Sequence, residues 1–345
     1  MVNDTLNSEE ERDHGGTPEV YEKHPKNPKT IVLLKDGIMS IGRVLICCSL
    51  WIAVQMLADD QNAKMPRPLN KGWYQSFETG ALHQVETGMG TAGDFGVSRF
   101  MARASIGYRK DFLNSTSLSF GYAHTSYQFN ALTGPWAAEP WGDVHTMSLS
   151  APIRRSFGSD WMLLAIPSIR TISEDNADLD QTMVGGIITG MSYQVRPGLT
   201  IGPGFGVLTQ LEDRVNVFPI VLVDWAISDK FKLQTGRGFG ASQGPGLVLS
   251  YALNDSWKLM VGGRMERFRL RLNSNGRVPN GVGQDRKASV SFGAQYALGK
   301  VGFITLYTGI NLSGELELND ASGNEIVATD YDSTPFVGLN ASIRF

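Results

Sequence analysis

Apolar and polar side chains alternate with a period of two residues along most of this chain, from about residue 98 to the carboxyl terminus. In the segment 115–129, Leu118, Phe120 and Tyr122 alternate with serine, glycine and alanine. Side chains two residues apart lie on the same face of a strand. The alternation therefore predicts strands that present one apolar face and one polar or small-residue face.

Clusters of Gly, Asn, Asp, Ser and Pro divide this region into segments that we interpret as strands. We place them at 77–88, 98–109, 115–129, 143–155, 161–173, 181–195, 199–212, 215–227, 231–237, 246–253, 257–271, 286–297, 302–317 and 335–345. Short spacers such as 110–114 and 254–256 alternate with long ones such as 130–142 and 319–334. Transmembrane barrels combine short periplasmic turns with longer extracellular loops, whereas a soluble sandwich has no reason to alternate in this way. We therefore predict an all-β fold, an antiparallel transmembrane β-barrel of 12–14 strands, with 12 applying if the first segments lie outside the wall.

A β-protein that spans a membrane has to close into a barrel, because hydrocarbon offers no hydrogen-bond partner to an open strand edge. Amphipathic aromatic residues stand near the ends of the predicted strands, where they suit the interfacial girdles of such a barrel. They are Trp161, Tyr193, Trp225, Tyr251, Trp257, Tyr296 and Tyr307. The alternative interpretation makes them core residues of a soluble sandwich.

Composition excludes several other classes of protein. The 345 residues include 39 glycines and only 19% charged residues, which argues against a coiled coil, and the 16 Phe, 10 Tyr and 7 Trp argue against a disordered chain. The 31 basic and 34 acidic residues nearly balance, so no nucleic-acid partner is expected. The five histidines are scattered, and the chain has no metal-binding motif. We therefore expect no metal and no cofactor.

The amino-terminal region contains an uncharged apolar run at 44–58, which also holds the only two cysteines, Cys47 and Cys48. The run is shorter than the roughly 20 residues that a membrane-spanning helix needs. With Arg43 just before it, the run resembles the core of a signal peptide for a chain that starts at Met39. We therefore divide the chain into a tail or mis-assigned start (1–38), a signal peptide (39–63), a periplasmic lead-in (64–76) and the barrel (77–345).

Charged residues gather in one predicted strand, 257–271, as Arg264, Glu266, Arg267 and Arg269. An Arg or Lys that faces lipid at mid-depth costs roughly 2–4 kcal/mol. We therefore expect these side chains to point into the lumen or to lie at the rim. An arginine-rich lumen would favour anions, and the alternative is a set of internal ion pairs that fill a closed lumen.

The carboxyl-terminal strand resembles the terminal strand of Gram-negative outer-membrane proteins, with Val337, Leu339, Ile343 and the final Phe345 on one face. The resemblance implies that the barrel-assembly machinery reads these residues as an insertion signal. The region 77–345, and particularly Val217 to Trp225, also resembles uncharacterised porin-like families of the outer membrane. This implies a Gram-negative outer-membrane location, contact with membrane lipid and lipopolysaccharide, and passive permeation or a structural role in the envelope. The sequence leaves open whether the barrel is a monomer or a homo-oligomer.

A second resemblance suggests a different function. His124 and Ser126 resemble the His-x-Ser pair of outer-membrane phospholipase A and lipid A deacylase, in which histidine activates serine on the lipid-facing wall near the outer rim. Residues two apart on a strand share a face and can form a hydrogen bond. Tyr127 stands where those families usually have Asn, and the next strand offers Asp143 and His145. The alternative function is therefore a lipid esterase or phospholipase-like hydrolase, and the sequence leaves open whether the protein is an enzyme.

Overall fold

The computed structural model describes residues 71–111, 113–212, 214–236 and 245–345. These form sixteen strands and two single-turn 3₁₀ helices, η1 (Gly134–Trp136) and η2 (Leu179–Gln181). The strands are β1 (Gly72–Gly88), β2 (Asp94–Arg109), β3 (Ser115–Asn130), β4 (Asp143–Ser150), β5 (Ile153–Phe157), β6 (Trp161–Glu174), β7 (Met183–Arg196), β8 (Leu199–Thr209), β9 (Val215–Ala226), β10 (Phe231–Gly236), β11 (Gly246–Ala252), β12 (Trp257–Arg271), β13 (Val282–Leu298), β14 (Gly302–Asn319), β15 (Glu325–Tyr331) and β16 (Thr334–Arg344). Within this part of the chain, no helix is both long and apolar enough to cross a membrane. The expected tail and signal peptide lie outside the described residues.

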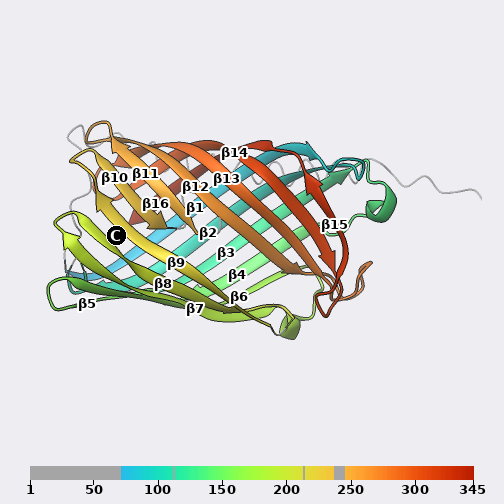
Figure 1. Cartoon of the computed structure of the whole chain (residues 1–345), viewed down its shortest axis with the longest axis horizontal. Helices are drawn as coiled ribbons and strands as arrows, with labels where there is room; N and C mark the ends of the chain where they lie inside the picture. Colours follow the sequence, from blue (N-terminus) through green and yellow to red (C-terminus); the bar gives the residue numbers. More distant parts are fainter. Residues whose placement is uncertain (1–70, 112, 213, 237–244) are drawn as a thin grey trace, which may run out of the picture. The chain divides into compact units, whose positions relative to one another are not determined.

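The strands pair with their chain neighbours in antiparallel order, and β16 pairs with β1 to close the wall. Two wall positions are each filled by two strands. β4 and β5 both lie between β3 and β6, and β15 and β16 both pair with β14. Sixteen strands therefore make a closed antiparallel barrel of fourteen wall positions (Figure 1), which confirms the predicted fold and the upper value of its strand number.

The predicted long spacer at 319–334 is wrong. The chain turns at residues 320–324 and returns as β15, which pairs with the end of β14. The Asp320 carboxylate holds the turn because it accepts hydrogen bonds from the backbone N–H groups of Ser322 (2.9 Å) and Asn324 (2.8 Å). A further bond from the Asn324 side chain, together with these backbone bonds, lowers the pKa of Asp320. The Asp and Asn residues that led us to expect a long loop thus form a tight turn.

The two ends of the barrel differ in their connections. β1 begins at Gly72, earlier than expected, and Ser76 pairs with Arg344, so both the start and the end of the wall lie at one end of the barrel. The same end holds the short turns between β2 and β3, β5 and β6, β7 and β8, β9 and β10, β11 and β12, and β13 and β14, on the left of Figure 1. Short turns mark the periplasmic end of an outer-membrane barrel, so the opposite end, with η1, is extracellular.

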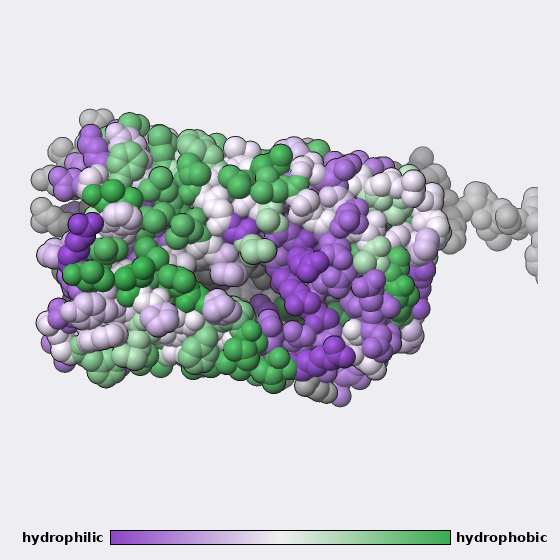
Figure 2. Space-filling view, in the orientation of Figure 1, coloured by the Kyte–Doolittle hydropathy of each residue, from purple (hydrophilic) through white to green (hydrophobic). Residues whose placement is uncertain are grey.

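The outward face carries the apolar side chains that alternation predicted. Leu118 and Phe120 are 50% and 53% exposed, and Phe205 and Leu306 are exposed in the same way on other strands. Figure 2 shows hydrophobic surface gathered over the part of the barrel nearer the short turns and a hydrophilic patch over the other part. An apolar outer band on a closed barrel is the arrangement that a bilayer requires, and the protein is a Gram-negative outer-membrane barrel.

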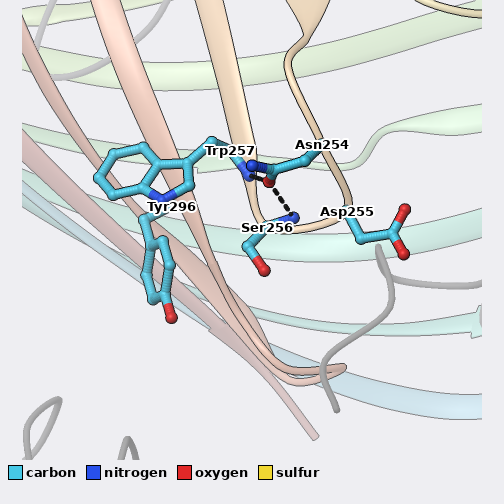
Figure 3. A pocket seen from close by; sticks show the side chains of 5 residues that line it. All are labelled: Asn254, Asp255, Ser256, Trp257 and Tyr296. Atoms are coloured by element: carbon cyan, nitrogen blue, oxygen red, sulfur yellow. Dashed lines mark hydrogen bonds between the residues drawn. The ribbon is translucent and has the colours of Figure 1, made fainter. Parts of the chain in front are cut away.

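Aromatic pairs ring the periplasmic edge of the apolar band. Trp73 with Tyr108, Trp161 with Tyr193, Phe231 with Tyr251, and Trp257 with Tyr296 have ring centroids 5.6, 5.0, 4.7 and 5.0 Å apart. The last pair borders an open depression at the β11–β12 turn (Figure 3), where the Asn254 side chain accepts backbone hydrogen bonds from Ser256 and Trp257. These outward rings form an interfacial girdle.

Tyr307 is a correction to the predicted girdle. Its side chain is 2% exposed and points inward, and its hydroxyl donates to the carbonyl of Ala81 at 3.2 Å. The ring lies over Gly338, where a Cβ would meet it at 2.2 Å. Glycine on the neighbouring strand therefore gives the ring room to lie flat against the inner wall.

Candidate functional site

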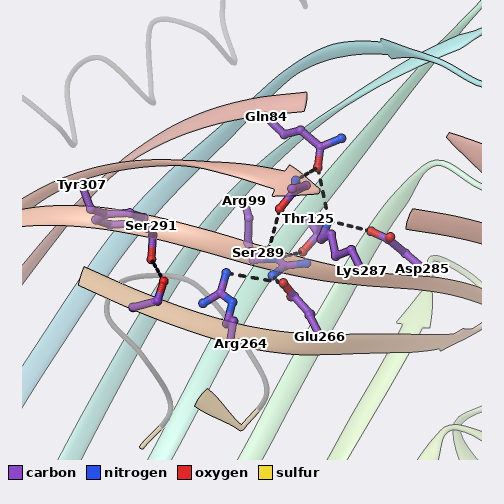
Figure 4. A network of polar contacts seen from close by, with 12 residues as sticks. Gln84, Arg99, Thr125, Arg264, Glu266, Asp285, Lys287, Ser289, Ser291 and Tyr307 are labelled. Atoms are coloured by element: carbon purple, nitrogen blue, oxygen red, sulfur yellow. Dashed lines mark hydrogen bonds and ion pairs between the residues drawn. The ribbon is translucent and has the colours of Figure 1, made fainter. Parts of the chain in front are cut away.

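A buried ion pair lies inside the barrel at the centre of a polar network (Figure 4). Arg99 of β2 donates from Nη1 to Glu266 Oε1 of β12 at 2.6 Å, and the two side chains are only 2% and 1% exposed. Arg99 Nε also donates to Thr125 Oγ1 at 3.0 Å, and its guanidinium lies over the Phe268 ring. Four wall positions separate β2 from β12, so the pair connects parts of the wall that are not adjacent.

A second polar cluster surrounds the Asp285 carboxylate on β13. It accepts hydrogen bonds from the Tyr127 hydroxyl (3.1 Å), the Tyr331 hydroxyl (2.8 Å) and Lys287 Nζ (2.8 Å). Lys287 Nζ also donates to the Gln84 side-chain oxygen at 3.2 Å. Every partner is buried, which makes this cluster part of a packed interior.

An apolar core fills the barrel at its extracellular end. Trp136 and Trp141, from the segment between β3 and β4, are each 2% exposed and pack in one cluster with buried side chains of the wall. That cluster contains Met89, Phe95, Val97, Tyr127, Val144, Ile172, Phe268, Leu270, Leu272, Leu316, Leu318 and Tyr331. On the extracellular side of the Arg99–Glu266 pair, packed side chains therefore close the lumen.

The extracellular connections are tied together across this closed end. The Glu174 carboxylate accepts hydrogen bonds from the backbone N–H groups of Gly142 (2.8 Å) and Asn273 (3.0 Å). Arg277 donates to the carbonyls of Pro135 (2.6 Å) and Ala138 (3.3 Å). These contacts join the segments 131–142 and 272–281 to each other and to β6.

Two other features mark the closed end. Arg271 of β12 pairs in parallel with Ser173 of β6, from another side of the barrel, and donates to carbonyls of extracellular turns. Partial burial and the nearby carboxylates of Glu174 and Asp143 raise the pKa of Glu139 in this region. The end of β12 and the carboxylates of the extracellular connections therefore both belong to the structure that closes this end of the barrel.

The predicted charged residues of β12 divide between its two faces. Glu266 and Arg264 point inward, and Arg264 Nη2 lies 3.6 Å from Glu266 Oε2. Arg267 and Arg269 project from the opposite face at the extracellular end, beyond the last apolar outward residue, Met265. Arg269 donates to Glu212 and to Gln210, and Arg267 donates to Gln284 at 2.6 Å.

Sequence reasoning missed several members of the network. Asp285 fell within a predicted spacer, Tyr331 within the predicted long loop, and Gln84 has no charge to draw attention to it. The sequence does mark Arg99, as it marks Arg264 and Glu266, because a charged strand residue is costly against lipid and is expected to point inward or lie at the rim. The partner of Arg99 on β12 could not be identified without the closed barrel.

The periplasmic part of the lumen is not packed. Arg103, four residues nearer the periplasm than Arg99, pairs with Glu78 at 3.2 Å, and these side chains are 25% and 30% exposed. Asp224 and Lys232 pair at 3.0 Å with side chains 49% and 40% exposed. Further inward-facing cations here have no acidic partner within the described part of the chain: Arg109, Arg154, Lys258 and Arg344. This part of the lumen wall therefore carries an excess of positive charge.

His124 and Ser126 lie on the outward face of β3 near its extracellular end. His124 Nε2 is 3.6 Å from Asp143 Oδ2, and no hydrogen bond joins His124 to Ser126 among the described residues. Beside them, His145 accepts or donates a bond to the Tyr122 hydroxyl at 2.8 Å and lies 3.2 Å from Asp175. The structure thus places a carboxylate beside His124 on the lipid-facing wall.

The residues of the expected assembly signal share one face of the last strand and its end. Val337 and Phe345 are 47% and 71% exposed on the outer side. Leu339 and Ile343 lie between them in the chain and on the same face. Their strand, β16, pairs with β1 on one side and β14 on the other, where the wall closes.

Several solved structures are similar to this chain at low sequence identity. An outer-membrane channel from Pseudomonas putida F1, described as COG4313, is 10% identical, with 83% of this chain and 99% of that chain covered and a TM-score of 0.45. A FadL homologue from Pseudomonas aeruginosa is 11% identical (80% and 90% covered, TM-score 0.40). The translocator domain of autotransporter NalP from Neisseria meningitidis is 15% identical (90% and 98% covered, TM-score 0.37). No functionally curated protein matches the chain.

A family profile matches the greater part of the sequence. It covers residues 109–345, from the end of β2 to the carboxyl terminus, and so includes β12 and its charged side chains. The chain belongs to the family described as Domain of unknown function (DUF6268).

Proposed function

We propose that this barrel is a passive channel for small solutes across the outer membrane. The observation that carries the proposal is the contrast in exposure along the lumen. The Arg99–Glu266 pair is at most 2% exposed, whereas inward side chains nearer the periplasm, such as Glu78 and Asp224, are 30% and 49% exposed. Fourteen strands enclose more space than the roughly eight whose interior side chains alone can fill.

In this proposal, the packed extracellular end is the closed state of the channel. A solute moving along the axis would meet the Arg99–Glu266 pair and then the core around Trp136 and Trp141. Opening has to separate the segments 131–142 and 272–281, and the contacts of Glu174 and Arg277 oppose that movement. We therefore expect infrequent openings rather than a constantly open pore.

Conductance of the refolded full chain in planar bilayers tests the proposal. The wild-type protein should give brief, infrequent openings, and Glu266→Gln should increase their frequency because it removes the charge that holds Arg99. Glu315→Gln is the matched control, since Glu315 pairs with Arg286 on the outer face. Absence of channel events in both the wild type and Glu266→Gln would eliminate the channel and leave a structural role in the envelope.

One observation supports hydrolysis of a lipid ester as a second candidate function. His124 and Ser126 share the lipid-facing wall, and Asp143 lies 3.6 Å from His124 Nε2, where it could orient the imidazole. A productive enzyme would also need a rotamer in which the other ring nitrogen reaches Ser126 Oγ.

Phospholipid and ester turnover by the purified barrel tests this candidate. Activity should be lost in Ser126→Ala and in His124→Ala, and reduced in Asp143→Asn. His83→Ala is the control, because His83 lies on the same outer face but bonds to Ser98 at 3.0 Å. Turnover that survives either of the first two substitutions would rule out this pair as the catalytic residues.

A further inference from the structure

The inner wall formed by β6, β7, β8 and β9 is largely apolar along the middle of these strands. These four strands lie side by side (Figure 1), and their registers place neighbouring inward residues in continuous rows. One row runs through Ile166, Ile188, Gly206 and Phe218. The apolar inward residues are Met162, Leu164, Ile166, Val184, Ile188, Leu208, Phe218, Ile220 and Leu222.

Glycines on β7 and β8 make this wall smooth. A Cβ on Gly206 would meet the Phe218 ring at 2.2 Å, and one on Gly190 would meet Leu222 Cδ1 at 2.7 Å. The side chains of β9 therefore lie over the glycines of the neighbouring strands instead of projecting into the lumen. The result is a broad apolar surface in an interior that would otherwise be expected to be polar.

The inner wall elsewhere is more polar, although Leu82, Met101 and Ala123 form a small apolar cluster on β1, β2 and β3. On β2 and β3 the inward residues include Arg103, Ser105 and Ser119, and on β13 they include Ser291 and Gln295. Most of the apolar residues are half-buried, so the surface is not sealed within the core at the extracellular end. The lumen thus has an apolar side and a polar, cationic side.

Arg170 of β6 lies where these two sides meet. Its register partners are Ser148 on the polar side and Val184 on the apolar side, and Ile166 is two inward positions away on the same strand. Within the described part of the chain, the Arg170 side chain makes no ion pair or hydrogen bond, although it is half-buried. A guanidinium next to hydrocarbon is costly without an anion, and it binds carboxylates in a bidentate manner.

We propose that the lumen binds amphipathic organic anions, with the acid group on Arg170 and the hydrocarbon part on the β6–β9 wall. This assignment rests on the proposed channel function and names its solute class. The apolar part would lie along Leu208, in the first inward row below the arginine, and along Ile166, Ile188 and Phe218 in the second. An inorganic anion would use only the charge, and a neutral hydrocarbon would use only the wall.

Binding measured by isothermal titration tests the proposal on the full chain in lipid nanodiscs, with empty nanodiscs subtracted. The probes are 4-phenylbutyrate, its neutral amide 4-phenylbutyramide, and acetate, which has almost no apolar part. We expect 4-phenylbutyrate to bind more tightly than either other probe. Arg170→Gln should weaken its binding about tenfold, which is the effect of one lost charge-assisted hydrogen bond, and should leave the amide unchanged.

Two further variants separate charge from fold. Arg170→Lys should recover most of the affinity, because it keeps the charge, and Ile188→Ser should weaken the acid and the amide alike. Arg155→Gln is the matched control, since Arg155 is exposed on the outward face of β5 and donates to a carbonyl.

Equal affinity for acid and amide, an unchanged affinity in Arg170→Gln, or no heat above that of empty nanodiscs would each overturn the proposal. Because titration does not depend on an open pore, its failure is distinct from a failure to conduct. Binding without conductance would exclude the channel function and support the binding site. Conductance without binding would support the channel function and exclude the binding site.

Discussion

At the scale of single residues, the stability of the closed end depends on a charge pair that is removed from water. Arg99 and Glu266 each lose hydration, and their attraction compensates only while both are present. Removing either partner takes away the closest opposite charge of the other, in a site that Phe268 and other apolar side chains line. An exposed pair such as Arg286 with Glu315 differs, because water and salt screen it.

Glu266→Ala should therefore reduce the free energy of unfolding by roughly 3–5 kcal/mol, the usual cost of breaking a buried pair. Glu315→Ala should reduce it by about 1 kcal/mol or less. The measurement is urea-induced unfolding of the barrel in lipid bilayers, followed by tryptophan fluorescence. Similar losses in the two variants would show that the interior pair is hydrated.

At the scale of elements, close approach between strands depends on glycine. The Phe218 ring of β9 lies over Gly206 of β8, Tyr307 lies over Gly338, and Tyr331 lies over Gly314. In each case a glycine on one strand receives an aromatic ring from the next. This keeps bulky inward side chains flat against the wall and leaves space in the lumen.

Gly206→Ala should destabilise the barrel by about 1–3 kcal/mol, because the new methyl group overlaps the Phe218 ring and the ring has to move. In Gly206→Ala combined with Phe218→Leu, the second change should cost less than it does alone, since the smaller side chain relieves the overlap. Urea unfolding of the four proteins in a double-mutant cycle measures this coupling. Strictly additive effects would mean that the ring does not lie over Gly206.

At the scale of the whole molecule, the charge of the lumen should determine which ions pass. Glu78 and Asp224, in the periplasmic part, are each paired with a cation, while Lys258 and Arg344 face the lumen with no acidic partner among the described residues. A wall of one sign concentrates ions of the opposite sign, and salt screens this effect.

The open channel should therefore prefer chloride to potassium, as measured by its reversal potential in a salt gradient. Lys258→Glu combined with Arg344→Glu should move the preference toward potassium, and Arg155→Glu, on the outer face, should not. The preference should weaken in about 1 M salt, where the Debye length is about 3 Å. A cation preference in the wild type would show that the exposed lumen charges do not govern permeation.

The sequence alone determined the strands, the face each presents to lipid and the end at which the short turns lie. These features are local, because a period of two sets the face and Gly, Asn and Pro set the turns. It therefore placed His124 and Ser126 on the outer wall, but it failed at Tyr307, whose inward orientation follows from its register with Gly338. It also failed at β15, where a short polar strand has the composition of a loop.

Only the tertiary structure decided that the lumen closes at its extracellular end and that its inner wall has two sides. Arg99 and Glu266 are 167 residues apart in the chain, and they meet only because the barrel closes and brings β2 and β12 within reach. The apolar inner wall likewise depends on the registers of four strands, β6 to β9. Alternation reports which residues share a face, but contacts across a lumen depend on how the closed barrel packs.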